Sequence, residues 1–260
     1  MNIVDFFRFP ISEPSEDCLF DITTSTMSDE LNMMSRSVVQ HSAVALFDSN
    51  IVNKEDELTF IREKSQSGQF SFFFMPNLNK SIESQIKLLK RAGCKAIVFH
   101  PYLQKITKND LQKVQEFSKA AEENDMFVCI CAAYGSKDIY NYFPLECVVS
   151  VASVVECPVV IIHGGGAKIM DAFLIADAFP HVILDTSFSL NYWLNTPVEE
   201  WFAVAMRRLG ADRWMFGSDA PFVNLEVAID RHVEFFSRHN FTKEEIDKIM
   251  GENAMKILKV

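Results

Sequence analysis

Two short motifs that follow buried-looking apolar runs carry side chains suited to acid–base chemistry. "VVIIHGGG" ends in His163 and three glycines, and "RWMFGSDAPF" contains Asp219. Imidazole and carboxylate groups are common proton carriers in enzymes, and glycines let the backbone turn sharply beside a ligand. We therefore predict that His163 and Asp219 are catalytic. The alternatives are a histidine bonded within a tight turn and an aspartate capping the helix near Asn224, although five residues are a long reach for a cap.

Four further polar residues end other apolar runs, and we expect them to bind the substrate. They are His100 in "VFHPYLQK", Cys131 in "FVCICAAYG", Arg8 in "DFFRFP" and Asp185 in "VILDTSF". Three of them also have a structural interpretation: His100 as a packed histidine, Cys131 as a buried thiol and Asp185 as a loop-capping aspartate. Side chains alternate along a strand, so if Phe7 and Phe9 face the site, Arg8 faces away unless the strand ends there.

The elements that must position these residues are eight short runs, apolar throughout rather than alternating. That pattern is typical of strands buried on both faces of a parallel sheet. The predicted strands are Asn2–Phe9, Ala43–Asp48, Phe70–Met75, Ala96–His100, Phe127–Ala132, Val159–His163, Val182–Thr186 and Trp214–Ser218. The candidate residues lie at or just beyond the carboxyl ends of these runs.

Helical patterns separate the runs, clearest over 81–93, 108–124 and 196–210. An eightfold βα alternation predicts a (β/α)8 TIM barrel in which residues 1–260 form one domain, with an open doubly wound sheet as the alternative. In such a barrel the carboxyl ends of the strands meet at one mouth, where active sites lie. The weakest part is Ile11 to Met34, which we expect to be a loop over the mouth with helix only from about Met27 onward.

Composition limits the classes of function. Among 260 residues, 48% are apolar and 23 are phenylalanine, which predicts a large aromatic core. A net charge of −10 argues against nucleic-acid or anionic-membrane partners. The six cysteines show no CxxC pair, and no signal-peptide pattern opens the chain, so we expect a cytoplasmic protein with reduced thiols. The expected partner is a small-molecule substrate, with a homo-oligomer left open.

Several motifs together resemble a known family. "IVDFFRFP", "KAIVFHPYLQ", "VVIIHGGG", "DRWMFGSDAPF" and "IMGENAMKIL" occur in the order typical of the amidohydrolase-related family. This branch of the metal-dependent hydrolase superfamily includes aminocarboxymuconate-semialdehyde decarboxylase and the metal-independent pyrone-dicarboxylate lactonase. The resemblance spans nearly the whole chain and implies a (β/α)8 barrel that acts on small carboxylated substrates.

The resemblance also implies a divalent metal such as zinc, held by an Asp-x-His-x-His run on the first strand, histidines on the fifth and sixth, and an aspartate after the eighth. Asp5 matches, as do the two catalytic candidates on the sixth and eighth strands. The first-strand histidines fall on Phe7 and Phe9, and the fifth-strand histidine falls on Cys131. Phenylalanine has no lone pair for a metal. We therefore expect a degenerate metal site and no bound cofactor.

Three functional hypotheses follow. The first is a hydrolase or lyase for a small carboxylated or lactone-type substrate that works without the usual metal, Asp219 activating water and His163 polarising the carbonyl. The second is a non-catalytic barrel that serves as a binding or partner subunit, with Phe7 and Phe9 filling the cavity. The third makes Cys131 a nucleophile beside that imidazole and carboxylate.

Overall fold

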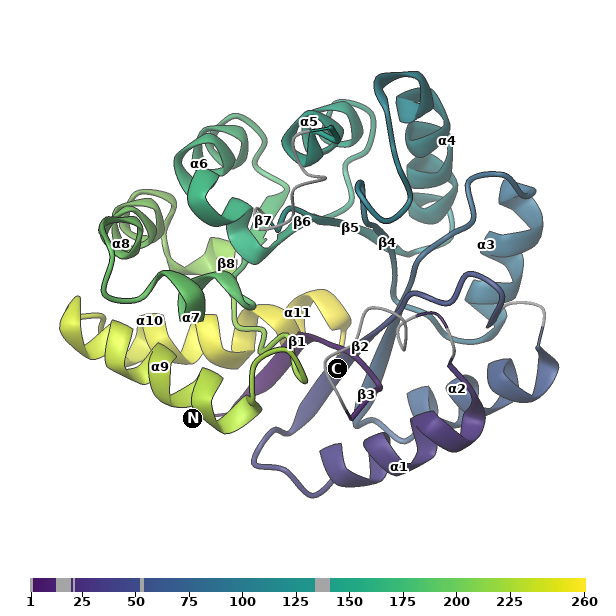
Figure 1. Ribbon diagram of the computed structural model, residues 1–260, viewed down its shortest axis with the longest axis horizontal. Coiled ribbons are helices and arrows are strands. Elements are labelled where there is room, and N and C mark those ends of the chain that lie inside the picture. Colours follow the sequence, from purple (N-terminus) through teal and green to yellow (C-terminus); the bar gives the residue numbers. More distant parts are fainter. Residues whose placement is uncertain (1, 13–19, 21, 52–53, 134–140) are drawn as a thin grey trace.

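A computed structural model describes residues 2–12, 20, 22–51, 54–133 and 141–260, and shows eight parallel strands in sequential order around a barrel (Figure 1). The strands are β1 (Val4–Arg8), β2 (His41–Leu46), β3 (Phe70–Phe74), β4 (Ala96–Phe99), β5 (Phe127–Cys131), β6 (Val159–Ile162), β7 (Val182–Asp185) and β8 (Trp214–Met215). Backbone bonds complete the ring: the N–H of Phe6 donates to the carbonyl of Phe216 at 3.0 Å, and that of Phe9 to Ala220 at 2.9 Å. The predicted TIM barrel is confirmed.

Helices surround the barrel on the outside (Figure 1). They are α1 (Thr24–Met34), α2 (Glu55–Gln66), α3 (Ile82–Arg91), α4 (Leu111–Glu122), α5 (Pro144–Ala152), α6 (Ile169–Ala178), α7 (Ser189–Trp193), α8 (Pro197–Leu209), α9 (Leu225–Arg238), α10 (Lys243–Asp247) and α11 (Asn253–Leu258). Within the described ranges, no helix has the length and apolar character needed to cross a membrane.

The helix boundaries follow the local signals. Thr196 caps α8 by accepting from an N–H of the first turn, and Gly93 follows α3 with a φ of +76° that favours glycine. α1 begins three residues before the expected start at Met27, because Thr23 and Thr26 form a reciprocal capping box there. Of the loop expected over the mouth, residues 13–19 and 21 lie outside the described part of the chain.

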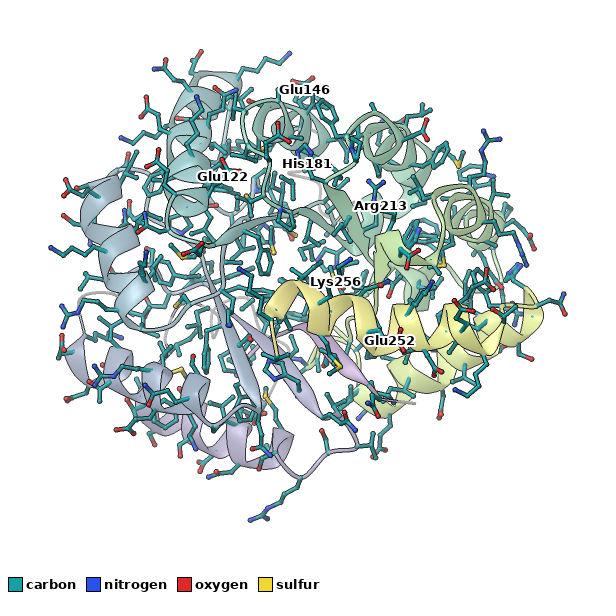
Figure 2. The ribbon with its side chains drawn as sticks, turned by 180° about the vertical axis from the view of Figure 1, so that it is seen from behind. Glu122, Glu146, His181, Arg213, Glu252 and Lys256 are labelled. Atoms are coloured by element: carbon teal, nitrogen blue, oxygen red, sulfur yellow. The ribbon has the colours of Figure 1, made fainter. Side chains whose placement is uncertain are left out.

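The barrel interior is filled mainly by aromatic rings. Phe6, Phe73 and Phe127 form a mutual cluster with ring centroids 5.1–6.0 Å apart. At the amino-terminal end of the strands, Ala254 and Leu258 of α11 join the same interior cluster. Figure 2 shows this end from behind, with the carboxyl-terminal helices crossing the barrel and Glu252 and Lys256 labelled on them. The interior is therefore a packed core, and the polar candidate residues lie at the opposite end, where the strands have their carboxyl termini.

A bulge in β1 decides which way its side chains point. Asp5 pairs with Ser42 and Arg8 with Val44, so three steps along β1 match two along β2. The extra residue breaks the alternation, and Phe6 and Phe7 both belong to the interior cluster.

Arg8 ends β1, so alternation along the strand does not decide which way its side chain faces. Its guanidinium Nη1 lies 3.7 Å from a carboxylate oxygen of Asp5. Burial raises the pKa of Glu30 on α1, and the charge of Arg8 opposes that shift. Arg8 therefore lies beside Asp5 and within electrostatic range of α1, and its expected contact with a substrate stays a prediction.

Candidate active site

His163 follows β6 in a tight turn that only glycines can complete. Its own φ is +66°, and Gly164 and Gly165 follow with +57° and +82°. A Cβ added to Gly165 would lie 2.8 Å from the Cβ of Ala172, and one on Gly164 would lie 3.2 Å from the carbonyl oxygen of Asp185. The glycines thus let the chain turn within the packed end of the barrel and leave the imidazole at the mouth, as the motif indicated.

The hydrogen bonds of His163 define its tautomer. Its Nδ1 lies 2.9 Å from the backbone carbonyl oxygen of Ser187 and 3.1 Å from the hydroxyl of the same residue. A carbonyl only accepts, so Nδ1 carries the hydrogen, and in the neutral ring Nε2 keeps a lone pair. Burial lowers the pKa of His163 to about 4, although the bond to Ser187 opposes the shift. At neutral pH the imidazole is an uncharged proton acceptor.

Asp219 is a buried carboxyl group with spare hydrogen-bonding capacity. Its backbone N–H donates to the carbonyl of Phe7 at 2.9 Å, which fixes the residue beside β1. Its side chain is not a helix cap, since Asn224 caps α9. Its Oδ1 is buried with no partner in the described part of the chain. Burial, reinforced by the carboxylates of Asp185 and Asp5, raises the pKa of Asp219 well above its ordinary value, so the protonated form is favoured.

Asp185 holds the ends of β6 and β7 together. One of its oxygens accepts the backbone N–H of His163 at 3.2 Å and the backbone N–H of Ser187 at 3.1 Å, and it also accepts the Ser187 hydroxyl. Burial raises the pKa of Asp185 to about 7, despite those bonds. These contacts give Asp185 a positioning role for His163, whereas the sequence suggested a substrate contact or a loop cap.

His100 is buried at the end of β4 among aromatic rings. Its ring meets Phe47 edge-on at 5.2 Å and Tyr102 at 4.1 Å, and its backbone N–H donates to Gln104 at 2.8 Å. Its Nδ1 has no partner within the described ranges. Burial, helped by the nearby His163, lowers the pKa of His100 well below its ordinary value. The electrostatic effect of one imidazole on the other places both in the same region of the mouth.

Cys131 ends β5 in the same region but is poorly suited to nucleophilic chemistry. Its side chain is buried, and burial is the main cause that raises its pKa, with Asp219 and Asp185 adding to the shift. A thiol that stays protonated is a weak nucleophile. These facts weigh against the cysteine hypothesis and favour Cys131 as a packed residue near the two carboxyl groups.

Asp5, Phe7 and Phe9, where the resemblance implies metal ligands on the first strand, are engaged in other contacts. Asp5 accepts the backbone N–H of Ser218 at 2.7 Å and its hydroxyl at 2.6 Å, one on each oxygen. Phe7 and Phe9 pack edge to face at 5.3 Å, and Phe9 also contacts Phe47 at 5.1 Å. In the part of the chain that the structure covers, no three His, Cys, Asp or Glu side chains gather in a way that would hold a metal ion.

Two serines organise the mouth. Ser187 accepts from His163 and donates to Asp185, and Ser218 links β1 to the segment after β8 through Asp5. Sequence reasoning grouped Ser187 with Asp185 as a loop cap or substrate contact and overlooked Ser218. The available signal was position, since Ser187 lies two residues after Asp185 and Ser218 lies directly before Asp219.

Gly217 supplies a test of this packing. A Cβ added there would lie 2.4 Å from Oδ2 of Asp185, 2.9 Å from the Cβ of Ser187 and 3.2 Å from the Cβ of Phe7. We expect Gly217→Ala to lower the free energy of unfolding by about 2–3 kcal/mol, since overpacked cores lose about 1–3 kcal/mol. Urea denaturation measures it. As a control, Gly68→Ala has open space but a φ of +78°, and should cost about 1 kcal/mol. A Gly217→Ala variant as stable as the parent would contradict the packing described.

Comparisons with known proteins agree with this architecture. The comparison with curated proteins gave no match. A probable 2-pyrone-4,6-dicarboxylic acid hydrolase from Acinetobacter baumannii has a TM-score of 0.70 at 15% identity, covering 100% of both chains. A putative 2-pyrone-4,6-dicarboxylic acid hydrolase from Pseudomonas putida has a TM-score of 0.68 at 16% identity, covering 99% of this chain and 97% of that chain. A 2,6-dihydroxybenzoate decarboxylase from Rhizobium has a TM-score of 0.67 at 14% identity, covering 100% of this chain and 99% of that chain.

These likenesses show a shared fold. The sequence itself also matches the profile of a family described as Amidohydrolase, over residues 25–260. That match takes in every strand after β1 and both catalytic candidates. The chain belongs to the amidohydrolase family.

Proposed function

We propose that this protein is a hydrolase for a small carboxylated ester or lactone, and that His163 and Asp219 carry the reaction. The observation that carries the proposal is the buried carboxyl group of Asp219, whose Oδ1 has no partner in the described chain. A buried polar atom left unsatisfied costs about 1–3 kcal/mol, which is explicable when a substrate supplies the partner. Two structures with the same fold are named for enzymes of small ring carboxylic acids, 2-pyrone-4,6-dicarboxylic acid and 2,6-dihydroxybenzoate.

The protonation states favour an exchange of the roles expected from sequence. Asp219 activating water requires a carboxylate, but its raised pKa favours the neutral acid. His163 polarising a carbonyl requires an N–H at Nε2, but its hydrogen lies on Nδ1. We therefore assign the base to His163 and the acid to Asp219, because at neutral pH each is already in the protonation state that its role requires.

The reaction then proceeds with balanced protons. Water attacks the carbonyl carbon, and its proton passes to Nε2 of His163. The bond from that carbon to the ester oxygen breaks, and the proton of Asp219 passes to the leaving oxygen. The acid product departs, and the imidazolium returns one proton to the Asp219 carboxylate, which restores both residues.

We further propose that the reaction needs no divalent metal. A catalytic zinc takes three protein ligands. Both oxygens of Asp5 already accept bonds from Ser218, and Phe7 and Phe9 offer no lone pair. The donor set of the family's usual site is therefore incomplete in this chain.

The non-catalytic barrel is the second candidate, and one observation favours it. The rings of Phe7, Phe9, Phe47 and Phe222 pack against one another over the mouth, with neighbouring centroids 5.1–5.5 Å apart. His163 and Asp219 are each only 5% exposed. A binding subunit would have this filled mouth and no turnover of any ester or lactone.

Asp219→Asn separates these candidates. We expect it to abolish hydrolysis of small lactones and esters yet stabilise the fold at pH 8. A folded-state pKa above the unfolded value gives stability that is lost as pH rises, and asparagine avoids that loss. The gain should reach about 1.4 kcal/mol or more, the equivalent of one pKa unit, and vanish below about pH 4. Denaturant unfolding at several pH values measures it.

The matched control is Asp230→Asn, which removes an exposed carboxylate from α9. It should leave turnover unchanged and show no comparable pH-dependent gain. Turnover retained by Asp219→Asn would contradict the assignment of the acid. Lack of turnover in the parent protein, across lactones, esters and amides, would favour the binding subunit.

Chelation tests the metal-free proposal. Turnover should stay within about twofold after exhaustive treatment with EDTA or dipicolinate, because no step requires a Lewis acid. Elemental analysis of the purified protein should find far less than one equivalent of zinc or manganese. Loss of activity on chelation, with recovery on adding zinc, would show instead that His163 and Asp219 hold an ion.

A further inference from the structure

A cavity of about 320 Å³ opens beside the mouth, between the segment after β7 and the start of α9. α7, which follows β7, packs against α9 (Figure 1). The residues that matter in its lining are Phe188, Asn191, Tyr192, Phe222 and Arg231. Phe222 also contacts Phe9 at 5.5 Å, so the cavity adjoins the aromatic rings of the mouth.

Asn191 is a buried amide without protein partners. Its side chain is 4% exposed, and neither Oδ1 nor Nδ2 forms a hydrogen bond within the described residues. Burying an amide with nothing to bind is unfavourable. An acceptor oxygen of a ligand in the adjoining cavity would accept a hydrogen bond from Nδ2 of Asn191.

Arg231 makes the cavity selective for anions. It carries the one charge among the residues found to line the cavity, in a chain whose net charge is −10. Its Nη1 donates to the backbone carbonyl of Asn191 at 3.1 Å, which directs the guanidinium toward that residue. The first N–H groups of α9 are already capped by Asn224, so the positive charge for a ligand comes from Arg231.

Phe188 lines the cavity and also contacts the imidazole of His163. It occupies a γ-turn with φ 54° and ψ −57°, closed by the N–H of Ser189 donating to the carbonyl of Ser187 at 2.5 Å. A residue other than glycine rarely adopts this backbone conformation, which is strained. Its ring stacks on Tyr192 at 5.5 Å and meets His163 edge-on at 6.3 Å. The strained turn thus sets an aromatic face next to the catalytic histidine.

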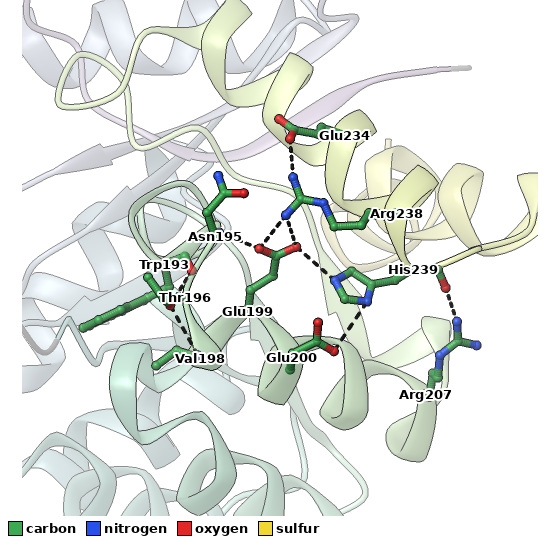
Figure 3. Close-up of polar contacts among 10 residues, drawn as sticks. All are labelled: Trp193, Asn195, Thr196, Val198, Glu199, Glu200, Arg207, Glu234, Arg238 and His239. Carbon is green, nitrogen blue, oxygen red and sulfur yellow. Dashed lines mark hydrogen bonds and ion pairs between the residues drawn. The ribbon is translucent and has the colours of Figure 1, made fainter.

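The walls of the cavity are held in a fixed relation. Figure 3 shows buried Glu199 of α8 accepting the backbone N–H of Asn195 at 2.6 Å, and Nη1 of Arg238 on α9 at 2.7 Å. Its carboxylate also lies 3.0 Å from Nε2 of His239. One carboxylate therefore ties the segment after α7 to the end of α9, and the bond from Arg231 to the backbone carbonyl of Asn191 joins α9 to α7 directly.

We propose that this cavity is the subsite that binds the acid group of a planar ring substrate. The carboxylate pairs with Arg231 and Asn191, and the ring lies against Phe188 with its reacting carbonyl directed to His163. The proposal rests on the proposed hydrolase function for the direction of the reacting group. Recognition of the carboxylate itself does not depend on turnover.

Benzoate is the probe, with benzyl alcohol as its uncharged counterpart. Titrations followed by protein NMR should show benzoate shifting signals of residues around Phe188 and Tyr192. Arg231→Gln should weaken benzoate binding about tenfold or more, because the variant loses a charge-assisted hydrogen bond, and should leave benzyl alcohol binding unchanged. Arg36→Gln, an exposed arginine outside the cavity lining, is the matched control and should leave both affinities unchanged.

A second variant guards against a folding artefact. Asn191→Leu should weaken benzoate binding while leaving the melting temperature equal or higher, because the amide it replaces has no protein partner. Lack of benzoate binding, or equal affinity in the parent and Arg231→Gln, would overturn the subsite.

The two proposals fail in different ways. Binding is measured in the Asp219→Asn background as well as in the parent. Benzoate binding that depends on Arg231, with no turnover of any lactone or ester, would sustain the subsite and refute the hydrolase. Turnover whose KM is unchanged by Arg231→Gln would sustain the hydrolase and refute the subsite.

Discussion

Burial of three carboxyl groups at one end of an aromatic barrel is the constraint on which the rest of this structure depends. Asp5, Asp185 and Asp219 are all buried, and burial raises the pKa of each. Their hydrogen bonding differs in degree. Both oxygens of Asp5 are bonded to Ser218, one oxygen of Asp185 is engaged and the other is not, and Asp219 keeps an unpartnered Oδ1. Hydrogen bonds therefore satisfy both oxygens of Asp5 and one oxygen of Asp185, while Oδ2 of Asp185 and Oδ1 of Asp219 have no partner among the described residues.

The same burial acts on the imidazole with the opposite sign. It disfavours the charged form of His163 and the charged form of Asp219, and so it creates a neutral base and a neutral acid in the same region. The buried rings of Phe7 and Phe9 belong to the same apolar environment, and Phe7 meets the imidazole of His163 edge-on.

Much of the fold was readable from sequence, because strands buried on both faces appear as continuous apolar runs. All eight were found, and His163 and Asp219 stood out as polar residues directly after them. The bulge in β1 was not predictable, because it depends on the pairing of β1 with β2. It brings Phe6 into the same interior cluster as its neighbour Phe7. The roles of Asn191 and Arg231 were also hidden. They lie 40 residues apart and meet only because α7 packs on α9.

The tautomer and charge of His163 test the account most directly. Nitrogen-15 NMR of histidine-labelled protein, assigned with His163→Gln, reports both. The account predicts a neutral ring with hydrogen on Nδ1 from pH 8 down to pH 5, titrating only near the pKa of about 4. A ring protonated on Nε2 at neutral pH, or one that titrates near 6.5, would contradict it.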